Sequence, residues 1–142
     1  MLSLEYIAGL VDGEGCIGII NRTVKGRMLD PYLHINICHE GILLQVKEAL
    51  GVGAIYKESR QSKGGLDCYL YACCSRLTII TALTKLLPFL IVKKPQAEIV
   101  LKFCLNRKAN YSYTKEEYQL WRDQATLQHK RNHSTKSPPN FT

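Results

Sequence analysis

The stretch that decides the fold is Tyr6-Ile7-Ala8-Gly9-Leu10-Val11-Asp12-Gly13-Glu14-Gly15-Cys16-Ile17. Ser3, just ahead of it, is a good N-cap, so the pattern predicts a short helix that ends at Gly13 and passes into a strand. Gly9 and Gly13 are four residues apart and share one helix face, where they would let another backbone approach closely. An interior glycine costs a soluble helix about 1 kcal/mol, and such a close contact would offset that cost.

Two acidic residues, Asp12 and Glu14, fall at the predicted C-terminal end of this helix. The helix dipole disfavours negative charge at that end. A carboxylate placed there, with an apolar strand directly after it, indicates either a bound cation or an ordinary solvated turn. Both interpretations stay open on this segment alone.

Outward from this stretch, hydrophobic periodicity predicts strand pairs alternating with helices. Strands are expected in two pairs, at 16–22 with 32–39 and at 52–59 with 66–74. Helices are expected at 41–50, at 76–87 and from Pro95 onward. The order α-ββ-α-ββ-α predicts an α+β fold: one four-stranded antiparallel sheet with helices packed on one face and the other face open.

The C-terminal part carries weaker signals. A capping box, Thr114-x-x-Glu117, opens a last helix through Trp121. Residues 129–142 are polar and contain no acidic residue, which predicts a disordered basic tail. The length of 142 residues and the lack of an internal repeat indicate a single domain, here residues 1–128.

Charge is the first clue to function. Nineteen Lys and Arg against 12 Asp and Glu give a net charge of +7. A basic domain of this size typically binds a polyanion, nucleic acid by default, while a solvated basic surface is the plainer alternative. The six cysteines lack C-x-x-C spacing and lie mostly in apolar runs, which indicates reduced core thiols and no zinc site. No apolar stretch approaches a membrane span and no secretory signal is visible, so an intracellular location without membrane contact is expected.

The segment 7–15, with its neighbours, resembles the LAGLIDADG motif of homing endonucleases, in the form Y-I-A-G-L-V-D-G-E-G. The resemblance continues in Leu50-Gly51-Val52-Gly53, which is similar to the family's G-x-G ahead of the third strand. It extends to the segment 87–97, which is similar to the family's L-P-F-L-x-x-K-x-x-Q-A, and so covers about residues 4–106. It implies the αββαββα homing-endonuclease fold with a saddle-shaped sheet, the same order that periodicity predicts.

Family members with two motifs are monomers, and this chain shows one motif. The resemblance therefore implies a homodimer whose motif helices cross at the two-fold axis. The interface residues expected from it are Ile7, Gly9, Leu10 and Gly13.

The resemblance also implies an activity: an intron-encoded, site-specific endonuclease that cleaves both strands of a long pseudo-palindromic DNA target with Mg²⁺, or with Mn²⁺ as a substitute. Glu14, the last motif acid, would be catalytic and bind the metal at the dimer axis, whereas Asp12 would support the motif helices. Lys93 matches the family's basic active-site residue. His39 falls where relatives often carry a polar pocket residue at the end of the second strand.

Side chains of the open sheet face and its loops are expected to contact double-stranded DNA, because Arg and Asn read base edges and Lys binds phosphate. The expected contacts are Arg22, Lys25, Arg27, His34, Asn36, Lys57, Arg60 and Lys63. The alternative function is an RNA maturase or a non-cleaving DNA-binding protein of the same family, and the retained Glu14 favours the enzyme. The expected location is a bacterial cytoplasm, or the chloroplast or mitochondrion that encodes the chain.

Overall fold

The motif stretch forms a helix that turns directly into a strand. The computed structural model describes residues 1–21, 29–58 and 67–106, together with 116, 119, 121 and 123, and in it helix α1 spans Leu4–Glu14. Strand β1 follows at once as Gly15–Asn21. The helix continues past Gly13, the predicted end, because the chain reverses at Gly15 instead. A Cβ on Gly15 would lie only 2.8 Å from the Val11 carbonyl oxygen, so this tight reversal requires glycine.

The remaining elements follow in the expected order. They are β2 (Leu29–Ile37), α2 (Glu40–Leu50), β3 (Ala54–Glu58), β4 (Cys68–Cys73), α3 (Arg76–Leu86), the 3₁₀ turn η2 (Leu87–Phe89) and α4 (Lys94–Leu105). The predicted α-ββ-α-ββ-α order and the fourth helix are confirmed. None of the described helices is long and apolar enough to cross a membrane.

The predicted C-terminal helix lies mostly outside the described residues, as does the predicted tail at 129–142. Residues 116, 119, 121 and 123 are helical. Trp121 packs edge-on against Phe103 of α4, with 5.6 Å between the ring centroids. This contact attaches Trp121 to the core.

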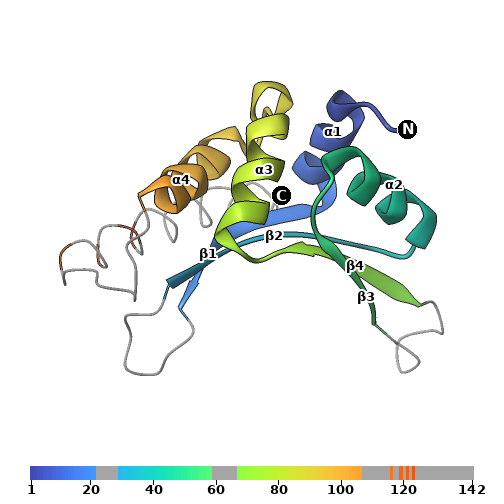
Figure 1. Ribbon diagram of the computed structural model, residues 1–142, viewed down its shortest axis with the longest axis horizontal. Coiled ribbons are helices and arrows are strands. Elements are labelled where there is room, and N and C mark those ends of the chain that lie inside the picture. The colour runs from blue at the N-terminus through green and yellow to red at the C-terminus, as the bar shows by residue number, and fades with distance from the viewer. Residues whose placement is uncertain are drawn as a thin grey trace, which may run out of the picture.

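The four strands form one antiparallel sheet in the order β1-β2-β4-β3. The two hairpins therefore meet at the centre, where β2 pairs with β4. Figure 1 shows all four helices on one face of the sheet, which arches so that both hairpins point away from them. The opposite face is consequently open and concave, as the saddle-shaped prediction requires.

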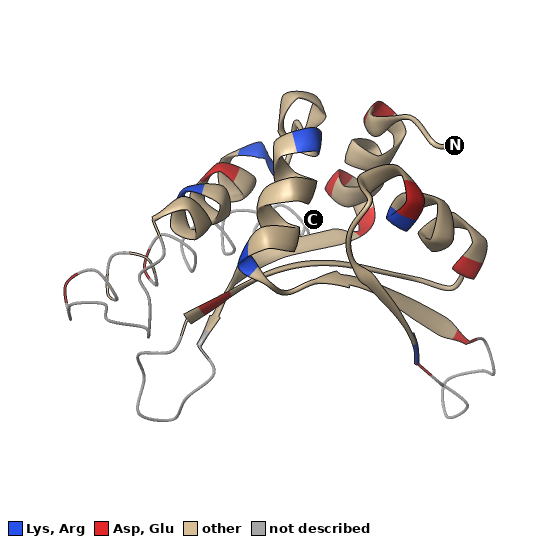
Figure 2. Cartoon of the chain, viewed as in Figure 1, with Lys and Arg blue, Asp and Glu red and all other residues tan. Residues whose placement is uncertain are grey.

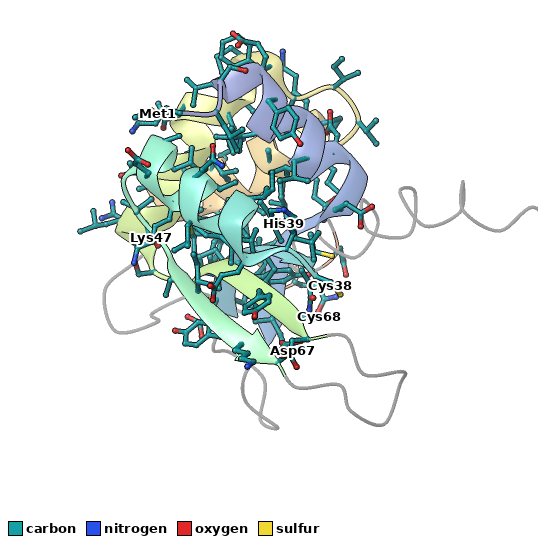
Figure 3. The ribbon with its side chains drawn as sticks, turned by 90° about the vertical axis from the view of Figure 1, so that its right-hand side faces the viewer. Met1, Cys38, His39, Lys47, Asp67 and Cys68 are labelled. Atoms are coloured by element: carbon teal, nitrogen blue, oxygen red, sulfur yellow. The ribbon has the colours of Figure 1, made fainter. Side chains whose placement is uncertain are left out.

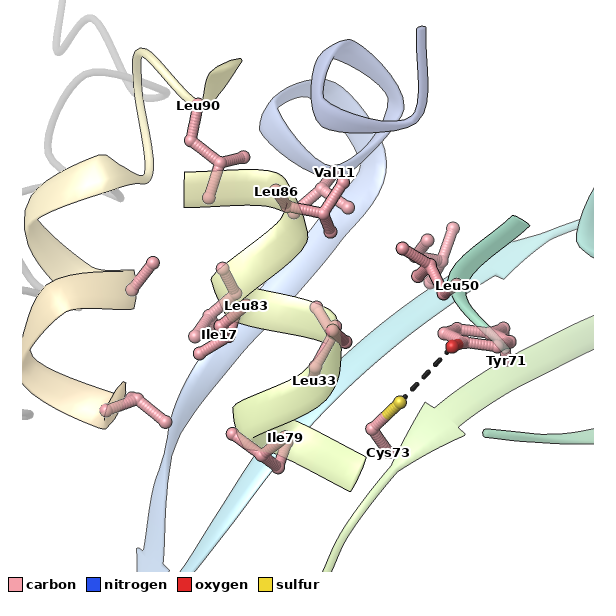
Figure 4. Close-up of a cluster of buried hydrophobic side chains, with 14 of the residues drawn as sticks. Val11, Ile17, Leu33, Leu50, Tyr71, Cys73, Ile79, Leu83, Leu86 and Leu90 are labelled. Atoms are coloured by element: carbon pink, nitrogen blue, oxygen red, sulfur yellow. Dashed lines mark hydrogen bonds between the residues drawn. The ribbon is translucent and has the colours of Figure 1, made fainter. Parts of the chain in front are cut away.

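The hydrophobic core lies between the sheet and the helices. Three strand residues that face the helices, Ile17, Leu33 and Tyr71, have no exposed surface (Figure 4). The predicted alternation of β2 is confirmed, because Leu33 and Ile35 are buried while His34 and Asn36 are half-buried on the open face. The prediction for the cysteines is only half right. All six are free thiols, but Cys16, Cys38 and Cys74 are exposed.

A side chain of α4 reaches the backbone of strand β1, which lies at the sheet edge. Gln96 is 4% exposed, and its Nε2 donates a hydrogen bond to the Ile17 carbonyl. Since β1 has a strand neighbour on one side only, this bond fixes α4 against the edge of the sheet.

The connection from α2 to β3 requires two glycines. Gly51 ends α2 in the left-handed conformation, with φ of 76° and its N–H bonded to the Lys47 carbonyl at 2.8 Å. Gly53 has φ of 106°, and a Cβ there would lie 2.4 Å from the Tyr71 ring. The Tyr71 hydroxyl in turn donates a 2.6 Å hydrogen bond to the Val52 carbonyl, so this ring holds the connection in place.

Alanine substitutions at the two glycines separate backbone strain from steric overlap. Gly51→Ala should cost about 1 kcal/mol, because its Cβ would meet only the Lys85 Nζ, at 3.8 Å, and the cost is conformational. Gly53→Ala should cost about 3 kcal/mol, because the same strain is joined by a clash with a buried ring. Urea unfolding of both variants measures the difference. Equal losses would show that the Tyr71 contact contributes nothing.

Candidate functional site

The C-terminal end of α1 is fastened to a segment that lies far away in the sequence. The Asp12 carboxylate accepts two backbone hydrogen bonds, from the Ile91 N–H to Oδ2 and from the Lys93 N–H to Oδ1, both at 2.9 Å. The Lys93 side chain adds a third hydrogen bond, in which its Nζ donates to the Asp12 main-chain carbonyl at 2.7 Å. Three hydrogen bonds therefore join the last turn of α1 to the connection between η2 and α4.

These contacts give Asp12 and Lys93 roles in positioning the helix. Both Asp12 carboxylate oxygens accept backbone N–H groups, as expected of a residue that supports the motif helix. Lys93 is 8% exposed, and its charge lies against a carbonyl at the negative end of the α1 dipole, a favourable arrangement. The structure thus places Lys93 at the same helix end as Glu14 with its amine directed at the backbone, and its role in an active site stays a prediction.

Glu14 is the last residue of α1 and is exposed. Among the described residues none donates a hydrogen bond to its carboxylate or forms an ion pair with it. At this helix end Glu14 is therefore the acidic group that remains available to an external cation.

At Gly9 and Gly13 the outer face of α1 has no packing partner within the described part of the chain. A Cβ built on Gly9 or Gly13 would find no atom within 4 Å, and Tyr6 is 51% exposed. Leu10 is half-buried beside them. Ile7, which was also expected at the interface, has no exposed surface, because it points into the core on the opposite side of the helix. That expectation is wrong for Ile7.

His39 lies at the start of α2, where Figure 3 labels it next to Cys38. It is the N-cap of the helix, and its Nδ1 accepts a hydrogen bond from the Ile42 N–H at 3.1 Å. The imidazole must then carry its proton on Nε2 when neutral, so the exposed ring presents a donor outward. The structure assigns His39 a capping function, and its expected role in a pocket remains a prediction.

The open sheet face is hollowed near its β1–β2 hairpin. A depression of about 400 Å³ is lined by Cys16, Ile19, Ile20, Tyr32, His34 and Cys74. The His34 ring lies 5.0 Å from that of Tyr32 and its Nε2 is 3.7 Å from the Cys74 Sγ. Burial lowers the pKa of His34, although the Glu58 carboxylate opposes that shift. Burial at this face thus favours the neutral form of the His34 imidazole.

Lys57 does not lie on the open face. In the β3–β4 register it pairs with Tyr69 and alternates with Tyr56 and Glu58, so it points to the face that carries the helices. There it forms an exposed ion pair with Asp67, 3.2 Å between Nζ and Oδ2, and this hydrogen bond raises the pKa of Lys57. The expected DNA contact through Lys57 is thus misplaced. The other basic contacts, Arg22, Lys25, Arg27, Arg60 and Lys63, lie outside the described residues.

Three basic side chains in the described part of the chain bond carbonyl groups at helix ends. Lys93 bonds a carbonyl of α1, Lys85 Nζ bonds the Leu50 carbonyl at the end of α2 at 2.9 Å, and Arg76 Nε bonds the Cys104 carbonyl at the end of α4 at 2.8 Å. Figure 2 shows most of these blue segments on the helices. The ranges 1–21, 29–58 and 67–106 hold seven Lys and Arg against nine Asp and Glu. The excess of basic residues therefore resides in the remaining sequence, including the hairpin connections 22–28 and 59–66, which contain five Lys and Arg and no acid.

Sequence reasoning missed Glu58, which accepts a hydrogen bond from Asn36 Nδ2 at 3.1 Å on the open face. Period-two alternation with Tyr56 places Glu58 on one face of β3. The contact with Asn36 also depends on the strand order, which places β3 two strands away from β2 with β4 between them. No local sequence pattern predicts that order, so the sequence does not predict the contact.

The two acids of the motif should differ sharply in their effect on folding. Asp12→Asn replaces an acceptor by a donor against a backbone N–H, so urea unfolding should show a loss of about 2 kcal/mol. Glu14→Gln should leave stability unchanged or slightly higher, because it removes an exposed charge from the unfavourable end of a helix dipole. A comparable loss in Glu14→Gln would mean that Glu14 has a structural partner.

Comparisons with known proteins now bear on this geometry. No family model matches the chain. The DNA endonuclease I-CvuI of Chlorella vulgaris is 27% identical over 107 residues, 71% of this chain. The chain spans 63% of that protein's length.

Three solved structures are similar to the chain along most of its length. I-CvuI in complex with the I-CreI target in the presence of Mg has a TM-score of 0.67 at 21% identity and covers 98% of this chain and 84% of its own. An archaeal intron-encoded homing endonuclease, I-Vdi141I complexed with DNA, has a TM-score of 0.69 at 20% identity. The match covers 97% of this chain and 86% of that one. The LAGLIDADG meganuclease I-AabMI bound to uncleaved DNA has 0.65 at 22% identity, and the match covers 81% of this chain but 40% of that one. The resemblance is confirmed: the chain has the fold of the LAGLIDADG homing endonucleases and is similar in sequence to one of them.

Proposed function

We propose that the chain is one subunit of a site-specific DNA endonuclease that uses a divalent metal. The observation that carries this proposal is the state of the acids at the end of α1. Asp12 is fully engaged by backbone N–H groups, while Glu14 is exposed directly beside a bare helix face. A protein that only bound DNA would gain nothing from an acid at this position. The similar protein I-CvuI is a DNA endonuclease, which supports the same activity here.

The donor chemistry of the site fits Mg²⁺ better than a transition metal. The described residues contain no group of three or more His, Cys, Asp or Glu side chains that could hold a metal. Mg²⁺ accepts one or two carboxylates and fills its other positions with water and substrate phosphate. Two copies of Glu14, one from each subunit, would supply that set, and Mn²⁺ would substitute. The bound ion would provide Lewis acidity for water attack at phosphorus and for the departing 3′ oxygen.

The residues around Glu14 hold it at the helix end. Asp12 fixes the last turn of α1 against the 91–93 segment, which restricts where the Glu14 backbone lies. The buried Lys93 ammonium binds the Asp12 carbonyl in the same helix turn and so adds a positive charge at the end of α1 that carries Glu14. These contributions are positional and electrostatic, and neither residue needs to touch the substrate.

A homodimer completes the proposed site. One chain supplies one exposed motif acid, and the bare face formed by Tyr6, Gly9, Leu10 and Gly13 can accept the same face of a second copy. Such a two-fold contact is self-complementary, and the absence of side chains on both glycines permits close backbone approach.

Gly9→Leu tests the dimer. The monomer has open space at this position, so the variant should fold normally and yet lose dimerisation, because a leucine cannot fit between backbones at glycine distance. Light scattering gives the molar mass and circular dichroism checks the fold. Glu98→Leu, which adds the same side chain to an exposed site on α4, should remain dimeric. A Gly9→Leu dimer as stable as the parent would exclude this face.

DNA is proposed to lie along the open concave face. The strands there would meet base edges, while the basic connections at 22–28 and 59–66 would supply the phosphate contacts that the described strands lack. A two-fold dimer doubles this surface, which accounts for a long pseudo-palindromic target.

Glu14→Gln should abolish cleavage and preserve binding. The substitution keeps the size of the side chain but removes the charge that holds the metal, and it also removes a negative group that faces phosphate. Plasmid linearisation in Mg²⁺ should fall below detection, while a gel shift of the same DNA in Ca²⁺ should show equal or tighter binding.

Glu48→Gln is the matched control, since it neutralises an exposed acid on α2 and should cleave at the parent rate. Undiminished linearisation by Glu14→Gln would place the active site elsewhere. A parent protein that binds its site but cleaves it in neither Mg²⁺ nor Mn²⁺ would favour the non-cleaving or RNA maturase function.

A further inference from the structure

One polar pair spans the open face between strands that are not neighbours. Asn36 on β2 donates from Nδ2 to Oε2 of Glu58 on β3, at 3.1 Å. Strand β4 runs between them, and Cys68, which pairs with Glu58 in the register, is only 7% exposed. Asn36 lies opposite Leu70, so the pair crosses β4 diagonally between Leu70 and Cys68, on the surface that the proposed function assigns to DNA.

The bridge fixes which way the Asn36 amide points. An ionised carboxylate can only accept hydrogen bonds, so the amide must turn its NH₂ group toward Glu58. The Asn36 Oδ1 has no hydrogen-bond partner among the described residues. One N–H and the carbonyl oxygen of Asn36 thus remain for a ligand, and they lie on one edge of the amide when Glu58 takes the N–H that points away from Oδ1.

That remaining pair is complementary to one base. In the major groove adenine presents N7 as an acceptor next to the N6 amino donor, and asparagine can bind both at once. Guanine presents two acceptors, N7 and O6, so the Asn36 carbonyl would face an oxygen. Cytosine and thymine offer a single polar group, and each could form only one of the two bonds.

We propose that Asn36 reads an adenine in each half of the DNA target and that Glu58 is its positioning residue. The inference rests on the proposed function, because it requires DNA on the open face. Glu58 acts through Asn36 by restricting its amide to the orientation that adenine needs. Its carboxylate also carries a cost, since a negative charge on this face repels phosphate at every sequence.

The experiment selects bound duplexes from a randomised DNA pool in Ca²⁺, using the parent chain and its variants, and sequences what is retained. The parent should prefer adenine by at least about fivefold at one symmetric pair of positions. Asn36→Ala should lose that preference there and keep it everywhere else. Asn36→Ser, which retains a polar group on the strand, is the second variant and should show the same local loss.

Glu58→Gln separates positioning from mere structural support. A glutamine amide both donates and accepts, so the Asn36 amide could turn over and present its NH₂ to the base. Adenine preference should therefore fall at the same positions, while total DNA affinity stays equal or rises because a negative charge is gone. Asp67→Asn is the matched control, because it also removes one negative charge beside the β3–β4 hairpin, from the carboxylate that pairs with Lys57. This variant should leave the base preference at every position unchanged. Thermal unfolding of each variant confirms that the fold is retained.

The outcomes are distinct. An unchanged base profile in Asn36→Ala, or a lost preference for a base other than adenine, would overturn the inference for Asn36. A full adenine preference in Glu58→Gln would overturn the role of Glu58 and leave the bridge a structural contact. If the parent enriches no sequence at all, the proposed function itself fails, and that result is visible before any variant is compared.

Discussion

The rest of the structure depends on how the end of α1 is held. Asp12 accepts two backbone N–H groups from a segment about 80 residues away, and Lys93 returns a bond to the Asp12 carbonyl. This contact sets the direction of the motif helix relative to η2 and α4. It thereby determines where Glu14 emerges and which helix face is left bare. The exposed carboxylate of Glu14 is thus positioned by the bonded carboxylate of Asp12.

Much of the fold can be predicted from the sequence, because it follows from patterns within short stretches of the chain. Alternation in β2 assigns Leu33 and Ile35 to the core and His34 and Asn36 to the open face, and glycine at 51 and 53 marks the turn into β3. The sequence predicts the end of α1 at Gly13, one residue before the observed end at Glu14, because both Gly13 and Gly15 are residues that can terminate a helix. Only the clash of a side chain at Gly15 with the Val11 carbonyl distinguishes them.

The sequence predicts the candidate site less well than the fold, because the contacts of the site join residues that are far apart in the chain. Lys57 was assigned to DNA from its charge, yet the β3–β4 register turns it to the other face and pairs it with Asp67. Ile7 was assigned to a subunit interface from its place in the motif, yet the helix phase points it inward. The structure shows His39 capping α2, and its role in a pocket stays a prediction. For Lys57 and Ile7 the residue type suits two environments, and the strand register and the helix phase select one of them.

The distribution of charge follows from the same packing. Lys93, Lys85 and Arg76 each bond a carbonyl at the end of a neighbouring helix, so these cations stabilise the helical layer. The described strands carry few charges, and the basic connections between them carry five with no acid. Under the proposed function, phosphate attraction and base discrimination would lie in different parts of the chain and could be altered separately.

The bond from Gln96 to the Ile17 carbonyl has a consequence for assembly. Strand β1 is an edge strand, and unpaired edges invite a strand from another chain to join the sheet. With one of its carbonyls already bonded to a buried amide of α4, β1 is a poor template for such an addition. A strand from a second chain is therefore disfavoured along this edge, so the sheet is not readily extended past β1.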